Sequence, residues 1–220
     1  MISPFWLRQP NVLLVSELQW PPERDQLPQD TDYLLCPRPL RDGAVGLREA
    51  LPSDCLMPLS PLERTPALHL CGPHAHLQDV LDMLQTQAAN APAPHGQPER
   101  IRYDWMDLAA LAGLGGALRL PSSSALARQG ALLALYGEGP DLPAAFAELR
   151  ASAAACLALQ AGLSASGQML CLMSSAHPLR PGQCQPLLQE ARSWWPHTGL
   201  LLGHAPGPGP SRVALLRLVS

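Results

Sequence analysis

Short, nearly unbroken apolar runs set between prolines and glycines narrow the fold class of this chain more than any other pattern. An apolar run without polar alternation is typical of a β-strand that other elements cover on both faces. Proline has no backbone N–H, so the 25 prolines among the 220 residues end such runs abruptly. Because 47% of the residues are apolar, the chain can bury a core. We therefore expect an α/β protein built from many short elements.

In residues 1–90, apolar runs alternate with short helical patterns. The residues from Val45 to Leu51 predict a short helix. The residues from His76 to Ala89 also have helical spacing, which places Leu77, Val80 and Leu84 on one face. The alternation of strands and helices predicts a small parallel α/β unit. The runs that predict its strands are Asn11 to Leu18, Tyr33 to Cys36, Cys55 to Leu59 and Ala67 to Cys71.

A Pro-rich break separates these residues from the rest of the chain. Ala88 to Arg100 (AANAPAPHGQPER) contains three prolines and a glycine, which interrupt the helical periodicity. We predict a linker over residues 91–100, between a truncated α/β unit (residues 1–90) and a second domain (residues 101–220).

From Ala131 onward the expected order is strand, helix, strand, helix, strand, strand. The Ala-rich segment from Leu142 to Leu159 predicts a strong helix with Asp141 as its N-terminal cap. Gln183 to Trp195 has the pattern of an amphipathic helix. This order predicts one mixed four-stranded sheet with helices on one face. The expected strands are Ala131 to Tyr136, Met169 to Met173, Gly199 to Gly203 and Arg212 to Val219.

Two carboxylates three residues apart, Asp104 and Asp107, stand between the Pro-rich break and an apolar segment from Leu108 to Leu118. Asp104 is well placed as the N-cap of a helix, and Asp107 would then face the positive end of the helix dipole. The alternative is that the pair reaches beyond its own chain. The residues alone leave both interpretations open.

Charge and cysteine usage exclude several classes of protein. All 15 basic residues are Arg, so a lysine-dependent phosphate loop and Schiff-base chemistry are excluded. A net charge of −3 without a basic cluster argues against a nucleic-acid binder. No apolar run is long enough to span a membrane, and the N-terminus lacks the pattern of a signal peptide. The six scattered cysteines have no CxxC pair, so we expect reduced, mostly buried thiols in a cytoplasmic protein.

One short segment has the composition of a metal site. Cys71, His74 and His76 lie within six residues of one another, but zinc usually needs four ligands in two spaced pairs, and no second pair is evident. A strand-to-helix turn with surface histidines is the simpler explanation of the segment. We expect no metal and no cofactor.

Two further groups could carry function. Ser174 and Ser175 lie near His177, but the GxSxG pattern of many hydrolases is absent. Trp194 and Trp195 come at the end of an expected helix, where they are more typical of a core-and-rim pair than of a binding platform. A small cytosolic enzyme that uses Ser, His and Cys groups therefore stays an alternative function.

The acidic segment resembles a motif of FtsZ, the bacterial tubulin-like cell-division GTPase. Ile101 to Leu108 (IRYDWMDL) is similar to that family's synergy loop, which reads I-N-x-D-F-A-D-V. Asp104 and Asp107 stand at the two acidic positions, Trp105 replaces the aromatic residue, and Arg102 replaces the asparagine.

Further stretches resemble the same family. Gly130 to Gly139 (GALLALYGEG), before an Ala-rich helix, is similar to its G-x-A-L-M-G-x-G strand. Gly167 to Met173 occupies the place of its small-G-V-L-V-N-I strand. Upstream, Val45 to Pro58 is similar to the family's G-I-x-x-L-R…D-x-L-I-V-I-P run. Asn11 to Leu18 is similar to the strand that precedes this run in the family.

The resemblance implies the second half of an FtsZ-like fold, with a C-terminal domain of the FtsZ type. The family's phosphate loop, G-G-G-T-G-T-G, has no counterpart, and the long central helix is broken at Pro92 and Pro94. In the family, one subunit holds GTP and the acidic loop of the next positions the attacking water. The resemblance therefore implies a degenerate, non-enzymatic cell-division module whose Asp104, Asp107 and neighbours contact a protein partner, either an FtsZ-like filament or a second copy. A pure scaffold is the remaining alternative.

Overall fold

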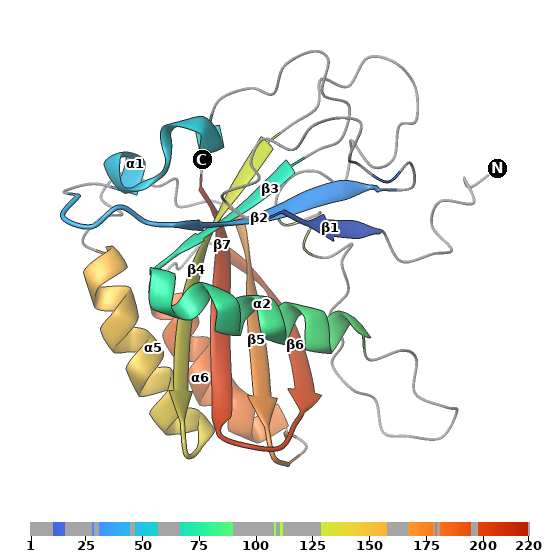
Figure 1. Cartoon of the computed structure of the whole chain (residues 1–220). Coiled ribbons are helices and arrows are strands. Elements are labelled where there is room, and N and C mark those ends of the chain that lie inside the picture. Colours follow the sequence, from blue (N-terminus) through green and yellow to red (C-terminus); the bar gives the residue numbers. More distant parts are fainter. Residues whose placement is uncertain are drawn as a thin grey trace.

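The computed structural model describes most of the elements that the sequence predicts (Figure 1). The structure describes residues 11–15, 28, 31–44, 47–56, 67–89, 108, 111, 129–157, 167–177, 179, 181–194 and 198–219.

Seven strands form one sheet in the order β1-β2-β3-β4-β7-β5-β6. Strands β1 to β4 pair in parallel, and so do β5 and β6, whereas β7 pairs antiparallel with both β4 and β5. Among these strands β7 alone therefore runs against the others. The bounds are β1 Val12–Leu14, β2 Tyr33–Pro39, β3 Ala67–Gly72, β4 Gln129–Gly139, β5 Gly167–Ser175, β6 Thr198–Pro206 and β7 Ser211–Val219.

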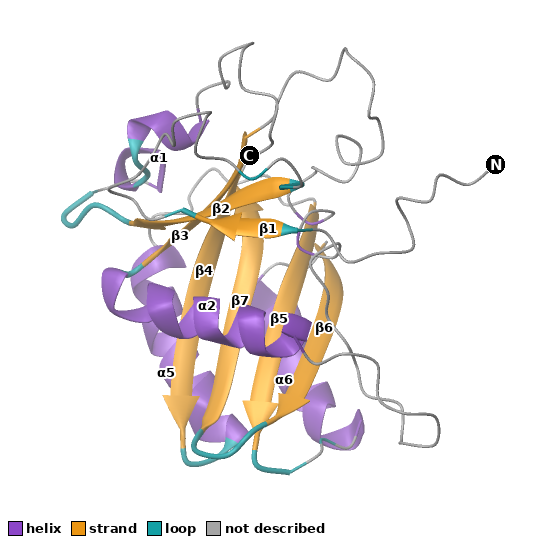
Figure 2. Ribbon diagram, turned by 45° about the vertical axis from the view of Figure 1, so that its right-hand side comes forward, coloured by secondary structure: helices purple, strands orange, loops and turns teal. Residues whose placement is uncertain are grey.

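Helices cover both faces of this sheet. Helix α2 (His74–Ala89) crosses one face, while α5 (Leu142–Leu157) and α6 (Pro181–Trp194) lie on the other (Figures 1 and 2). Two short elements, α1 (Leu47–Ala50) and the 3₁₀ helix η4 (Ser53–Leu56), connect β2 to β3. No described helix is long and apolar enough to span a membrane.

Each face of the sheet has its own core. The α2-side core contains Leu77, Val80 and Leu84 of α2, packed against residues such as Leu132 of β4 and Leu170 of β5. The core on the α5/α6 side is built from a second set of side chains. Its members include Leu133, Leu149, Cys171, Cys184 and Leu215. Because neighbouring residues of β4 and β5 face opposite cores, the middle of each strand needs consecutive apolar side chains, as in Ala131 to Leu135 and Met169 to Met173.

Helix α5 packs unusually close to β4 because two glycines of the strand lack side chains. A Cβ at Gly137 would overlap backbone atoms of Ala145 and Leu149, and one at Gly139 would lie 2.6 Å from the backbone nitrogen of Ala145. Asp141 begins the helix, since its Oδ1 accepts a hydrogen bond from the backbone N–H of Ala144 at 2.8 Å. The N-cap that the sequence predicts is confirmed.

The α/β class and the order of elements after Ala131 are confirmed. The mixed sheet β4-β7-β5-β6 forms as expected, with α5 and α6 on one face. It continues into the first strands, because β3 pairs with β4, for example Leu70 with Leu132. The predicted linker at residues 91–100 lies outside the described residues, and the division into two domains stays a prediction.

The strand expected from Cys55 to Leu59 is wrong at its start. Cys55 belongs to η4, where its backbone N–H donates to the carbonyl oxygen of Pro52 at 3.0 Å. Ser53 and Asp54 favour such a turn, because their side chains compete with strand hydrogen bonds. Residues 57–59 lie outside the described part. Within the strand predicted from Asn11 to Leu18, the structure describes β1 as Val12–Leu14 and places Val15 outside it. Residues 16–18 lie outside the described part.

Candidate functional site

The acidic segment predicted to meet a partner lies outside the described residues. This holds for Arg102, Asp104, Trp105 and Asp107, so their roles stay predictions. The next described residues, Leu108 and Leu111, are helical and buried in the α2-side core. Successive Cα atoms are about 3.8 Å apart, so Asp107 is attached directly to a residue fixed in this core.

The Cys-His segment starts within a strand and continues into a helix. Cys71 is buried in β3, while His74 and His76 belong to the first turn of α2. The ring of His76 contacts that of Tyr136, with centroids 5.6 Å apart. Within the described ranges, no three His, Cys, Asp or Glu side chains are arranged to hold a metal ion. The strand-to-helix turn is confirmed.

Ser175, the last residue of β5, hydrogen-bonds with the backbone of His177 and with the side chain of His204 on β6. The hydroxyl of Ser175 donates to the carbonyl oxygen of His177 at 2.7 Å and lies 3.1 Å from Nε2 of His204 on β6. Because the hydroxyl proton goes to the carbonyl, Nε2 of His204 donates to Ser175 and does not accept from it. A histidine that donates to the serine does not accept its proton, so it does not activate the serine as a nucleophile. The hydrogen bond instead links β5 to β6.

Trp194 is the last residue of α6, and Trp195 lies outside the described residues. Nothing in the described part bears on the contact role of this pair.

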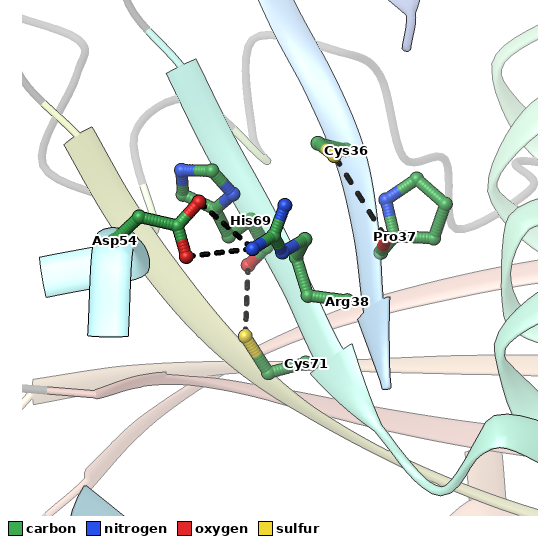
Figure 3. A network of polar contacts seen from close by, with 6 residues as sticks. All are labelled: Cys36, Pro37, Arg38, Asp54, His69 and Cys71. Atoms are coloured by element: carbon green, nitrogen blue, oxygen red, sulfur yellow. Dashed lines mark hydrogen bonds and ion pairs between the residues drawn. The ribbon is translucent and has the colours of Figure 1, made fainter. Parts of the chain in front are cut away.

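A polar cluster that the sequence analysis missed lies on the α5/α6 side of the first strands. The Arg38 Nη2 of β2 contacts both carboxylate oxygens of Asp54 on η4, at 2.6 and 2.8 Å. Figure 3 shows Arg38 reaching toward Asp54, with His69 and Cys71 on the neighbouring strand β3. The Arg38 side chain is 8% exposed and that of Asp54 is 41% exposed. The ion pair therefore has one buried end and one end in solvent.

Strand pairing explains how the cluster forms. In the register of β2 and β3, Cys36 is opposite His69 and Arg38 is opposite Cys71. Residues two apart in a strand point to the same face, so all four side chains project toward one side of the sheet. Cys55 then comes from η4, in the same buried cluster as Cys71 and Leu51.

Cys55 has a strongly perturbed environment in this cluster. A hydrogen bond from Cys71 lowers the pKa of Cys55 to about 5, and His69 and the charge of Arg38 act in the same direction. Burial opposes them, because it disfavours the charged thiolate. The pKa of Cys71 is correspondingly raised, chiefly by its hydrogen bond to Cys55 and by burial. The cluster thus favours the thiolate form of Cys55 and the protonated form of Cys71.

Arg38 supplies the positive charge of the cluster. Burial lowers the pKa of Arg38, but the negative charges of Cys55 and Asp54 outweigh this effect, so its pKa lies above the ordinary value. A thiolate beside a fixed guanidinium is the usual setting of a reactive cysteine. The signal in the sequence was the repeated i, i+2 spacing of Cys36 with Arg38 and of His69 with Cys71.

A second polar group joins the ends of β4 and β7. The hydroxyl of Tyr136 donates to Oε2 of Glu138 at 2.8 Å, and Nε of Arg212 lies 3.2 Å from the same oxygen. Burial and this hydrogen bond raise the pKa of Tyr136. The raised pKa keeps the Tyr136 hydroxyl protonated, so the group fits a structural role at the end of the sheet.

Three solved structures similar to this chain belong to the FtsZ/tubulin group. A mutant FtsZ of M. jannaschii is 12% identical, with a TM-score of 0.44, and the match covers 86% of this chain and 66% of that one. TubZ of Bacillus thuringiensis serovar israelensis, in GDP-form protofilaments, is 12% identical, with a TM-score of 0.45 and coverages of 95% and 59%. CetZ of Methanosaeta thermophila is 12% identical, with a TM-score of 0.39 and coverages of 94% and 61%.

The chain thus spans about two thirds or less of the length of these structures. No family model matches the sequence, and no curated protein matches it.

Proposed function

We propose that the chain is a non-enzymatic, tubulin-like assembly or regulatory module of the cytoplasm, which acts through protein–protein contacts. The observation that carries the proposal is the acidic segment Ile101 to Leu108, whose two acids match the synergy-loop pattern and whose end is anchored in the core. Its partner would be a filament of an FtsZ-like GTPase, and a second copy of this chain is the alternative partner.

The anchoring of Leu108 and Leu111 supports this role. Both side chains are buried among α2 and sheet residues of the α2-side core, at 0% and 3% exposure. A contact segment needs a rigid attachment, because ordering a loose one on binding costs free energy. The core thus provides a fixed base directly after Asp107.

The residue types in the segment suit a contact with a nucleotide-binding partner. A carboxylate from Asp104 or Asp107 can orient a water molecule for phosphoryl transfer. Trp105 and Arg102 are residue types enriched at the energetic centres of interfaces. The 220 residues contain no Lys and no Gly-rich phosphate loop, so we propose that they bind no guanine nucleotide on their own.

Co-sedimentation with polymerised FtsZ tests the proposal. Wild type should pellet with the filaments, whereas Asp104→Asn with Asp107→Asn should stay in the supernatant. Asp141→Asn is the matched control, because Asp141 is an established helix cap whose loss of charge should leave pelleting unchanged.

Sedimentation velocity of the chain alone tests the second-copy alternative. A concentration-dependent dimer that the double Asn variant loses would identify a second copy as the partner. A chain that neither pellets with filaments nor self-associates would overturn the proposal and leave a scaffold of another kind. Calorimetry with GTP checks the nucleotide claim separately, because saturable binding would contradict it.

A further inference from the structure

The cluster around Cys55 contains two polarised thiols that the proposed function does not use. Cys55 of η4 and Cys71 of β3 lie in one buried cluster, and each thiol perturbs the pKa of the other, although 16 positions separate them in the sequence. The Cys71 thiol also donates to the carbonyl oxygen of His69 at 3.9 Å. The groups that face them are His69, Arg38 and Cys36, and Asp54 pairs with Arg38. A positive charge beside a cysteine favours its thiolate form, which is the reactive form.

We propose that Cys55 and Cys71 form a redox-active dithiol, which hydrogen peroxide oxidises to an intramolecular disulfide. The pair combines one thiolate held by positive charge with one neighbouring thiol, which is the arrangement of a sensing and a resolving cysteine. Oxidation would join η4 to β3 covalently.

The chemistry balances with the peroxide as the oxidant. The Cys55 thiolate attacks one peroxide oxygen, the O–O bond breaks, and hydroxide leaves and is protonated to water. The product is a sulfenic acid on Cys55. The Cys71 sulfur then attacks the Cys55 sulfur, its proton goes to the leaving hydroxyl, and a second water departs. Two thiols and one peroxide thus give one disulfide and two waters.

The environment explains why Cys55 reacts first. The pKa of Cys55 is lowered to about 5, so the sulfur is a thiolate at neutral pH. Cys71 keeps its proton, because its pKa is raised. The residue Cys55 is 1% exposed, but η4 is a four-residue element whose Asp54 is in contact with solvent. A small local opening of η4 therefore admits a molecule as small as hydrogen peroxide.

A second pair of nearby cysteines serves as an internal comparison. Cys171 of β5 and Cys184 of α6 lie in the same core, and burial raises the pKa of Cys171 to about 12. Burial also raises the pKa of Cys184. Both thiols stay protonated, so peroxide should leave this pair reduced while it oxidises Cys55 and Cys71.

Peptide mapping of the full chain tests the proposal directly. The reduced protein is treated with one equivalent of hydrogen peroxide, its remaining thiols are alkylated with iodoacetamide, and it is cut with trypsin. Because trypsin cleaves after arginine, Cys55 falls in peptide 49–64 and Cys71 in peptide 65–100, each as the only cysteine. We expect a disulfide-linked pair of these two peptides. Peptide 151–192 holds Cys156, Cys171 and Cys184, and fragmentation of this peptide should locate alkylated thiols at Cys171 and Cys184.

A Cys71→Ser variant separates the two steps. Without the resolving thiol, the sulfenic acid on Cys55 should persist and be trapped by dimedone as an adduct on peptide 49–64. Wild type in which both peptides remain fully alkylated after peroxide would overturn the proposal. Wild type in which Cys171 or Cys184, located by fragmentation of peptide 151–192, is oxidised as fast as Cys55 would also overturn the proposal. Both results are obtained with wild type alone.

Discussion

The Nη2 of Arg38 touches both carboxylate oxygens of Asp54, although β2 and η4 are separated by a turn and a helix. The contact holds η4 against β2 and neutralises a guanidinium that the protein otherwise buries. It also fixes the charge that faces Cys55. The same residue pair thus links the local fold to the thiol chemistry.

Removing the carboxylate should destabilise the fold. Asp54→Ala leaves Arg38 buried without its carboxylate, which in a fully buried pair costs about 3–5 kcal/mol. Because the side chain of Asp54 is 41% exposed, water compensates in part, and we expect a loss of about 2 kcal/mol in the free energy of unfolding. Urea denaturation under reducing conditions measures it.

The control for this experiment is Asp42→Ala. Asp42 is exposed, in the turn after β2, so its removal should change the stability by less than about 0.5 kcal/mol. Equal effects of the two substitutions would show that Asp54 contributes only its surface charge.

Gly137 should not tolerate even a methyl group. A Cβ there would overlap backbone atoms of Ala145 and Leu149, so Gly137→Ala must push α5 away from β4. Overpacking of this kind typically costs about 1–3 kcal/mol. Gly182→Ala is the matched control, because nothing lies within 4 Å of its Cβ and alanine favours the helix, by up to about 1 kcal/mol. Thermal unfolding should move in opposite directions for the two variants.

The alkylation of Cys55 should have an unusually acidic pH profile. Only the thiolate reacts with iodoacetamide, so the rate for peptide 49–64 should rise around pH 5 and then level off. An ordinary thiol has a pKa of 9.0. Rates measured by mass spectrometry at several pH values determine the midpoint, and a value near 9 would contradict the environment described for Cys55.

The same shift has a consequence for stability. Because folding lowers the pKa of Cys55, its thiolate stabilises the folded chain most above the ordinary pKa of 9.0, and this contribution is lost as the pH falls through about 5. The free energy of unfolding of wild type, relative to Cys55→Ser, should therefore grow as the pH rises from about 5 toward 9. A pH-independent difference would mean that the sulfur is protonated throughout.

The sequence predicts the central strands well because their pattern is local. The run from Met169 to Met173 is apolar throughout because the strand is buried on both faces. β5 could therefore be predicted without knowledge of its neighbouring strands. The N-cap at Asp141 could be predicted equally well, because a cap acts on the next three residues. The pairing of β3 with β4 was not predictable in this way, because it joins segments about sixty positions apart.

The Cys55 cluster was missed for the opposite reason. The run Cys55 to Leu59 is apolar and resembles a strand, yet Cys55 lies in η4 because the carbonyl of Pro52 accepts its N–H. Its partners Arg38 and Cys71 come from two other elements, and only the register of β2 and β3 brings them together. The acidic segment from Ile101 to Leu108 is the opposite case. The sequence predicts its role as a contact segment, and a functional assay tests that role.

The GTP turnover of FtsZ filaments, measured with wild type and with Asp104→Asn plus Asp107→Asn, tests the proposed role of the acids most directly. Asparagine caps a helix almost as well as aspartate, so both proteins should unfold within about 2 °C of each other. Asparagine lacks the charge that orients water, so we expect wild type to change the turnover and the double variant to leave it at the rate of filaments alone. Equal turnover with both proteins, whether changed or unchanged, would show that the acids are structural.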